Sequence, residues 1–270
     1  MASAESQKHA QVYWEHGFVS GIPVISPEEA ADHRKHLESA EHQLGHALHY
    51  HSKVHTLLKS PLELATHPAL VDVVEAILGP DVMLYNVTYI IKEPKTVKFV
   101  SWHQDLTYWG FDGTEEASAW LALSPATAES GCMQMIPGSH QQGLREQITS
   151  DDPDNVLLQS QTIEDVPEED AVVCTLAPGE ASIHHGWTIH ASHPNTSEDR
   201  RIGLNIQYIT PKMKQIKAKS DSAMLIRGED RYGHFEADTP AEEWLPQDAK
   251  ERLMEATSKY HALTGSPNPA

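Results

Sequence analysis

Apolar residues recur with helical spacing through much of the first 80 residues of the chain. In the segment HPALVDVVEAILGP, five apolar residues fall on one helical face and Gly79-Pro80 ends the pattern: Leu70, Val73, Val74, Ile77 and Leu78. An earlier helix is predicted to begin after Ser26, because Ser26 can cap it, Pro27 suits the first helical position and two glutamates follow. Residues 1–80 are therefore predicted to be mainly helical.

From residue 81 the pattern changes to short stretches rich in Val, Ile, Tyr and Trp, which turn-forming sequences such as KEPK, FDG and PGSH separate. These stretches predict strands at residues 82–92, 97–105, 117–124, 132–136, 171–176, 180–186 and 200–209. Short strands in succession, with no helices between them, favour a sandwich or jelly roll over a parallel α/β sheet. The fold class predicted is mainly β, with flanking helices.

The chain is predicted to form a single domain, because all-β architectures of this length commonly do. A helical part at 1–80 precedes a jelly-roll core at 81–210, and an extension at 211–270 follows. Within the extension, residues 240–263 are predicted to form a helix that packs outside the sheet. The acidic stretch 150–170 interrupts the strand pattern and predicts a long loop or a lid.

Charge and composition narrow the class of partner. The formal net charge of −19 argues against nucleic acid and against an anionic membrane surface, so a small molecule is the expected partner. No apolar run has the length of a membrane span, and the first residues lack the apolar core of a signal peptide, so we expect a cytoplasmic protein. The two cysteines, Cys132 and Cys174, form neither a disulfide framework nor a Cys-rich zinc site. Any metal must therefore be held by histidine and carboxylate.

The sequence VSWHQDLTYW contains a candidate metal-binding pair, His103 and Asp105. In a strand, residues i and i+2 point to the same face, whereas on a helix they point to nearly opposite sides. Two similar His-x-Glu triplets begin at His36, in the helical region, and at His234, in polar irregular sequence, and both are interpreted as surface. His103 and Asp105 alone lie in a strand-like run, so they alone keep the geometry of ligands.

A third ligand would complete the two-histidine, one-carboxylate triad that suits Fe(II) and leaves coordination positions open. A second histidine-rich segment supplies four candidates, and spacing alone does not choose among them: His184, His185, His190 and His193. Arg200 and Arg201 follow at the start of a strand, so one of them points inward and the other outward. An inward arginine can bind a carboxylate through two parallel hydrogen bonds.

Several motifs together resemble the phytanoyl-CoA dioxygenase family of Fe(II)/2-oxoglutarate oxygenases. The motifs are WHQD followed by YW, then AWLAL, SGCMQMIPGSH, HASHPNTSEDRR and IGLNIQYI, in the family's order over roughly residues 85–210. The resemblance implies a double-stranded β-helix, a cupin-like jelly roll whose open end holds the metal. It also implies Fe(2+) as cofactor, with 2-oxoglutarate and O2 as co-substrates.

By position, the resemblance implies that His103, Asp105 and His190 hold the iron. It assigns Arg201 to the distal carboxylate of 2-oxoglutarate and places three more residues beside the co-substrate: Ser192, Trp120 and Cys132. For Trp120 and Cys132, ordinary core packing is an equal alternative. The other histidines of the second segment are then interpreted as structural or surface residues.

The reaction implied is hydroxylation of an unactivated C–H bond, with release of succinate and CO2. Related iron halogenases have a small residue in place of the carboxylate, so the presence of Asp105 favours hydroxylation. Two alternatives remain. One is a zinc or manganese hydrolase or isomerase of cupin type, which would not need Arg201, and the other is a non-catalytic ligand-binding jelly roll.

Strand alternation also predicts which residues face a substrate. Polar side chains would be costly in a dry core, so the polar residues on the inner face are assigned to a polar pocket: Asn86, Thr88, Gln134, Asn205 and Gln207. Tyr108 and Trp109 are predicted to form a wall of this pocket. Such a pocket favours a small polar substrate over a long acyl chain. Lys53 and Lys92 are expected at the surface, with contact to an anionic substrate or co-substrate as the alternative.

Overall fold

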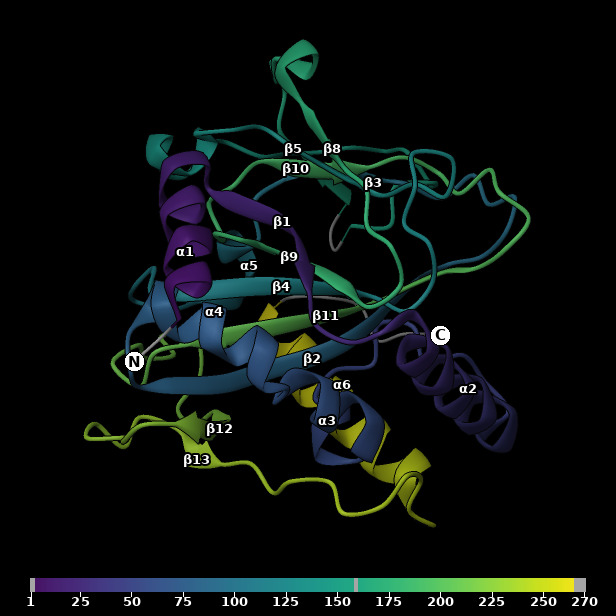
Figure 1. Ribbon diagram of the computed structural model, residues 1–270, viewed down its shortest axis with the longest axis vertical. Coiled ribbons are helices and arrows are strands. Elements are labelled where there is room, and N and C mark those ends of the chain that lie inside the picture. Colours follow the sequence, from purple (N-terminus) through teal and green to yellow (C-terminus); the bar gives the residue numbers. More distant parts are fainter. Residues whose placement is uncertain (1–2, 158–159, 265–270) are drawn as a thin grey trace.

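Two β-sheets form the centre of the molecule (Figure 1). The computed structural model describes residues 3–157 and 160–264. The larger sheet has the order β1 (Phe18–Pro23), β9 (Glu180–His184), β4 (Glu116–Ala122), β11 (Arg201–Ile209), β2 (Val82–Lys92), β12 (Ser222–Arg227) and β13 (Glu236–Ala237). The smaller sheet has the order β3 (Val100–His103), β10 (His190–Ser192), β5 (Met133–Met135) and β8 (Val172–Cys174). The predicted jelly-roll fold class is confirmed.

The N-terminal helices lie over or beside the outer face of the larger sheet (Figure 1). They are α1 (Ala4–His16), α2 (Pro27–Leu44), the short η1 (Val54–Thr56), α3 (Lys59–Ala65) and α4 (Pro68–Leu78). Helix α2 begins as predicted, because Ser26 Oγ accepts from Glu29 N while Glu29 accepts from Ser26 N. Helix α4 ends at Gly79, also as predicted.

Strand alternation separates an apolar face from a polar one. Val87, Tyr89 and Ile91 of β2 join Leu204 and Ile206 of β11 in the main hydrophobic cluster beneath the helices. The residues between them face the other way, toward the smaller sheet. The outer face of the larger sheet thus contributes to the core, while its inner face is available for a binding site.

Two strand predictions differ from the structure. The strand expected at 97–105 is shorter, because after His103 the chain turns into α5 (Leu106–Trp109). Strand β10 lies in the gap between the last two predicted strands. In addition, the sheet extends beyond 81–210, since β1 forms one edge and β12 adds beside β2. The sequence of β1, FVSGIP, contains serine, glycine and proline and gives too weak an alternation to be recognised.

The C-terminal helix is in a different place from the one predicted. Helix α6 (Ala249–Thr264) lies on the inner side of the larger sheet, where Tyr260 packs with Met83, Tyr85 and Ile209. In Figure 1 it is seen behind the strands, opposite α4. Packing outside the sheet was therefore the wrong prediction, because the apolar inner-face residues of β2 and β11 need a cover at this end.

The acidic stretch 150–170 is largely irregular, as predicted. Within its described residues the regular parts are β7 (Gln161–Thr162), which pairs with β6 (Ile148–Thr149) just before the stretch, and the short η4 (Glu168–Asp170). Residues 158–159 lie outside the described residues. A further short helix, η2 (Ser139–Gln142), follows β5. None of the helices in the described part of the chain has the length and apolar character needed to cross a bilayer.

Candidate metal centre and pocket

Three side chains converge between the two sheets and offer ligand atoms to one ion. His103, Asp105 and His190 place a ligand atom each so that all three lie within 4.8 Å of one another. Asp105 Oδ1 is 3.3 Å from His103 Nε2 and 3.8 Å from His190 Nε2. Both histidines are buried, and Asp105 is slightly exposed. Two imidazoles and one carboxylate in this arrangement form the triad that suits Fe(II).

The backbone explains why residues so far apart in sequence meet. His190 of β10 is the direct partner of His103 of β3 in the smaller sheet. Asp105 reaches them from the turn that precedes α5, where its backbone is in the right-handed helical region. The i, i+2 geometry predicted for a continuous strand is therefore wrong in detail, because the chain leaves the strand between the two ligands.

Hydrogen bonds fix the tautomer of both histidines. His103 Nδ1 lies 2.9 Å from Ser101 O, and His190 Nδ1 lies 3.0 Å from Thr188 O. A carbonyl oxygen only accepts, so each Nδ1 carries the proton and each Nε2 turns its lone pair toward the site. Burial also lowers the pKa of His190 well below its usual value, which keeps its imidazole neutral. The donor set fits a divalent cation.

A third histidine, His184, supports the carboxylate. Its Nε2 is 3.3 Å from Asp105 Oδ2, the oxygen that is farther from His103 and His190. Although burial raises the pKa of Asp105, the interactions with the three surrounding imidazoles outweigh this effect and lower it. His184 was one of four candidate ligands in the sequence, and no local signal distinguished this role from that of His190.

Arg201 is a buried guanidinium without a carboxylate partner among the described residues. It is 1% exposed, its Nη1 donates to Gly131 O at 2.7 Å, and its Nε has no hydrogen-bond partner. The Trp120 ring lies 5.0 Å from its Cζ. Burial lowers its pKa to about 10, so it still carries its charge at neutral pH. A buried cation left unpaired is costly unless an anion joins it, so the site fits the carboxylate of a ligand.

Lys92 lies beside Arg201, and its expected surface position is wrong. It is 5% exposed, is the direct cross-strand partner of Arg201, and donates to Ser192 Oγ at 2.8 Å and to the carbonyls of Ser192 and His193. Burial and the nearby Arg201 lower its pKa to about 6. Arg200, in contrast, points outward to Glu41 and Glu93, as alternation predicted.

The metal triad and Arg201 open onto one cavity of about 140 Å³. Eight of the predicted residues outside the triad and Arg201 line it: Asn86, Thr88, Tyr108, Trp109, Trp120, Ser192, Asn205 and Gln207. Two do not. The neighbouring Met133 lines the cavity in place of Gln134, because alternate strand residues face opposite sides, and Cys132 is buried in a small core cluster with Trp120.

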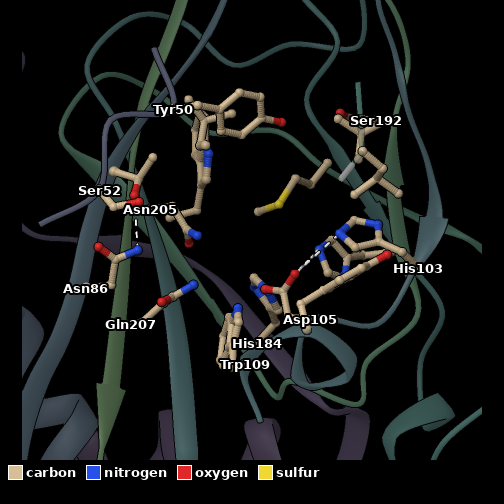
Figure 2. A pocket seen from close by; sticks show the side chains of 18 of the residues that line it. Tyr50, Ser52, Asn86, His103, Asp105, Trp109, His184, Ser192, Asn205 and Gln207 are labelled. Atoms are coloured by element: carbon tan, nitrogen blue, oxygen red, sulfur yellow. Dashed lines mark hydrogen bonds and ion pairs between the residues drawn. The ribbon is translucent and has the colours of Figure 1, made fainter. Parts of the chain in front are cut away.

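Residues that sequence reasoning missed complete the cavity. Tyr50 and Ser52 come from the loop before η1, Leu157 comes from the acidic stretch, and Tyr260 and His261 come from α6. Figure 2 shows Tyr50 and Ser52 on the side of the cavity opposite His103 and Asp105. They lie in or near irregular segments or on a helix expected elsewhere, so no periodic pattern pointed to them.

Comparisons with known proteins agree with this geometry. A sequence model described as "Phytanoyl-CoA dioxygenase (PhyH)" matches residues 15–203. "Phytanoyl-CoA dioxygenase 1" of Oryza sativa subsp. japonica is 34% identical over 121 residues, which cover 45% of this chain and 42% of that protein. "Phytanoyl-CoA dioxygenase domain-containing protein 1 homolog" of Dictyostelium discoideum is 26% identical over 215 residues, 73% of this chain and 66% of that protein. The chain therefore spans less than two thirds of each.

One solved structure resembles the chain over nearly its whole length. It is described as the apo form of the non-heme monooxygenase ThoJ. It is 28% identical, has a TM-score of 0.83, and the match covers 95% of this chain and 97% of that one. The similarity therefore includes regions beyond residue 203, where the family match ends.

Proposed function

Because the chain belongs to the phytanoyl-CoA dioxygenase family, we propose that it is an Fe(II)- and 2-oxoglutarate-dependent oxygenase. It hydroxylates an unactivated C–H bond of a small, polar metabolite and releases succinate and CO2. The observation that carries this proposal is the combination, in one cavity, of a His-Asp-His cluster with a buried arginine that lacks a carboxylate partner among the described residues.

Each part of the site has a role in this reaction. His103, Asp105 and His190 would hold the iron, and Arg201 would bind the distal carboxylate of 2-oxoglutarate. Lys92 fixes Ser192 at the same end of the cavity by donating to its hydroxyl. When bound, the iron and 2-oxoglutarate supply dioxygen activation. The chain itself orients the metal and co-substrate and presents the target carbon to them.

The surrounding side chains exclude water from the reacting centre. Trp109, Met133 and Tyr260 cover parts of the cavity with apolar surface, and Trp120 packs over Arg201. A cavity from which water is excluded strengthens the interaction of Arg201 with a carboxylate and limits side reactions. The small volume of the cavity supports a compact substrate over a long acyl chain.

Three alternatives are less well supported. A zinc or manganese hydrolase or isomerase of cupin type has no use for a buried cation in the cavity that holds its metal, and Arg201 is such a cation. A halogenase would lack the carboxylate ligand, whereas Asp105 is present and is held by His184. A purely ligand-binding role would not require three metal-binding groups in one place, two of them histidines with fixed tautomers.

The test is succinate formation from 2-oxoglutarate by the iron-loaded protein. We expect turnover that requires Fe(II) and that falls at least 100-fold in His103→Ala, because a facial triad with one ligand removed holds iron poorly. His193→Ala is the matched control, since His193 is exposed on the segment that carries His190, and it should keep the parental rate. If the iron-loaded protein neither binds nor consumes 2-oxoglutarate, the proposed function is wrong.

A further inference from the structure

The end of the cavity away from Arg201 carries hydrogen-bond donors that the metal and co-substrate do not use. Asn205, Gln207 and Trp109 line this end, and we refer to them together as the donor wall. In Figure 2 the two amides lie opposite His103 and Asp105, and the indole of Trp109 lies below, between the two sides. A substrate held between the donor wall and the metal would contact all three.

Two of these donors have a fixed direction. Gln207 Oε1 accepts from Tyr260 Oη at 3.4 Å, so the Gln207 amide turns its Nε2 toward the cavity. The indole Nε1 of Trp109 can only donate. Within the described residues neither nitrogen has a hydrogen-bond partner, and the Asn205 amide has none either. A buried donor without an acceptor is costly, so this end of the cavity favours a ligand that brings an acceptor.

Asn86 shows that unpaired hydrogen-bond donors are specific to the donor wall and are not common to every amide on this face. It lies on the same face of the sheet, but both ends of its amide are used. Its Oδ1 accepts from Lys53 N at 2.7 Å, and its Nδ2 donates to Thr88 Oγ1 at 3.1 Å. Asn86 and Thr88 therefore shape the cavity, whereas Asn205 and Gln207 remain available to a ligand.

The charges around this end oppose an anionic substrate. Lys53, in the loop before η1, is buried and paired with Asp238 at 2.9 Å. Asp221 accepts from Tyr85 Oη at 2.8 Å and has no cation partner within the described residues. Gln215 links Asp221 to the backbone of Trp109, so the carboxylate of Asp221 lies behind the donor wall. A second carboxylate at the donor wall would thus meet the negative charge of Asp221, while Lys53 is already neutralised by Asp238.

A cation is opposed for a different reason. The fixed groups of the donor wall, Gln207 Nε2 and Trp109 Nε1, are donors and cannot accept from an ammonium group. Asn205 can turn its amide to donate or accept. An uncharged carbonyl with an N–H beside it satisfies all three groups, because the oxygen accepts from the fixed donors and the N–H pairs with Asn205.

We propose that the substrate of this enzyme is a neutral molecule whose carboxamide or lactam group is bound by Asn205, Gln207 and Trp109. Tyr260, on α6, is the positioning residue that orients the Gln207 amide. This inference rests on the proposed function and adds the substrate class to it. It also gives a role to α6, which lies beyond the residues that the family model matches.

The test compares three six-membered-ring probes of different charge. δ-Valerolactam is a neutral carbonyl compound with an N–H, piperidine is a cation at neutral pH, and cyclohexanecarboxylate is an anion. Calorimetric titration of each into the anaerobic Fe(II)/2-oxoglutarate complex gives its Kd. We expect the lactam to bind at least tenfold more tightly than either charged probe. Equal binding of the three, or binding of none, would overturn the proposal.

Variants of the donor wall test the residues themselves. Gln207→Leu and Trp109→Phe should each weaken lactam binding about tenfold, since each removes one buried hydrogen bond. Tyr260→Phe should weaken it several-fold and reduce the preference for the lactam. General damage to the cavity would weaken all three probes alike, so the ratio of their affinities is the decisive readout. Unchanged ratios in all three variants would contradict the assignment.

Controls separate this inference from the function on which it rests. Gln141→Leu is a matched exposed glutamine outside the cavity and should leave lactam affinity unchanged. The Kd of 2-oxoglutarate is measured in every variant. If the parent protein fails to bind 2-oxoglutarate, the proposed function fails. If it binds 2-oxoglutarate normally but does not prefer the lactam, only the substrate class is wrong.

Discussion

At the scale of single residues, Arg200 and Arg201 form a natural pair for testing the co-substrate site. They are adjacent on β11 but point in opposite directions, one to surface glutamates and the other into the cavity. Arg201→Gln should raise the Kd of 2-oxoglutarate about 100-fold or more, because removing one member of a buried charge pair costs on the order of 2 to 5 kcal/mol. Calorimetry with the metal-loaded protein measures this.

Arg200→Gln is the matched control for that change. It removes the same charge from the neighbouring position, so any effect of net charge alone would be the same in both variants. We expect a Kd for 2-oxoglutarate within twofold of the parent protein. Similar weakening in both variants would show that Arg201 has no specific role in binding the co-substrate.

Gly203 is needed because the Trp120 indole packs directly over it. A Cβ at this position would lie 1.8 Å from Trp120 Cζ2, which is impossible without movement of the ring. Gly203→Ala should lower the free energy of unfolding by about 1 to 3 kcal/mol, as overpacking of a core does. Urea denaturation measures this change.

A second variant checks that this clash is the cause. Adding Trp120→Leu to Gly203→Ala makes room for the new methyl group. The two substitutions together should then cost less than the sum of their separate effects, since residues in contact are not additive. Strict additivity would mean that the loss in Gly203→Ala has another origin.

At the scale of elements, Gln104 joins three segments around the metal centre. It is fully buried and lies in sequence between His103 and Asp105, two members of the candidate metal triad. Its Nε2 donates to Gly143 O and Trp187 O, each at 2.8 Å, and its Oε1 accepts from Arg145 N at 2.9 Å. These hydrogen bonds connect the end of β3 to the segment after η2 and to the turn before β10. Strand β10 carries His190.

Gln104→Leu should therefore reduce both stability and metal affinity. It leaves two carbonyls and one N–H without partners, at a cost of about 1 to 3 kcal/mol for each group that water does not reach. We expect a loss of about 3 kcal/mol in urea denaturation and an Fe(II) affinity reduced tenfold or more. A variant that lost stability but kept the parental iron affinity would show that Gln104 does not position the ligands.

At the scale of the whole molecule, buried neutral histidines make stability depend on pH. His49 Nδ1 accepts from Ile91 N, and His185 Nδ1 accepts from Trp187 N. Burial lowers the pKa of each to about 4, compared with about 6.5 in an unfolded chain. Below pH 6.5 the unfolded chain binds protons that the folded protein does not, so stability falls as the pH drops from about 6.5 to 4.

The Tm should reflect this loss between pH 7 and pH 4.5. Each histidine contributes at most about 3 kcal/mol, because one pKa unit corresponds to about 1.4 kcal/mol. His49→Gln keeps an acceptor for Ile91 N but cannot take up a proton, so the variant should lose less stability on acidification than the parent. A pH dependence of the Tm equal to that of the parent would contradict this role of His49.

Prediction from the sequence succeeded where a repeating pattern decides the outcome. Strand β2 has the predicted bounds, 82–92, because an uninterrupted run of β-favouring residues lies between two turn signals. The capped start of α2 was predicted from Ser26 and the residues after it. The opposite directions of Arg200 and Arg201 follow from alternation alone.

Prediction failed where long-range contacts decide the outcome. Helix α6 has a recognisable helical sequence, but its position over the inner face depends on residues of β2 and β11 far away in the chain. Gln134 was assigned to the cavity, although the register of β5 turns Met133 inward instead. Lys92 was expected at the surface because a sequence does not show that its ammonium meets two carbonyls and a hydroxyl.

The sequence alone thus determined the fold class, the residue types available to a metal ion and the opposite directions of Arg200 and Arg201, because residue types and their periodicity encode these features locally. The family resemblance selected His190 over His184, and the tertiary structure gave the physical basis: His190 faces His103 across a strand pair, whereas His184 contacts the far oxygen of Asp105. Only the tertiary structure brought Tyr260 onto Gln207. The physical reason is that a pattern specifies which face a side chain takes, whereas strand register and helix docking specify what it meets there.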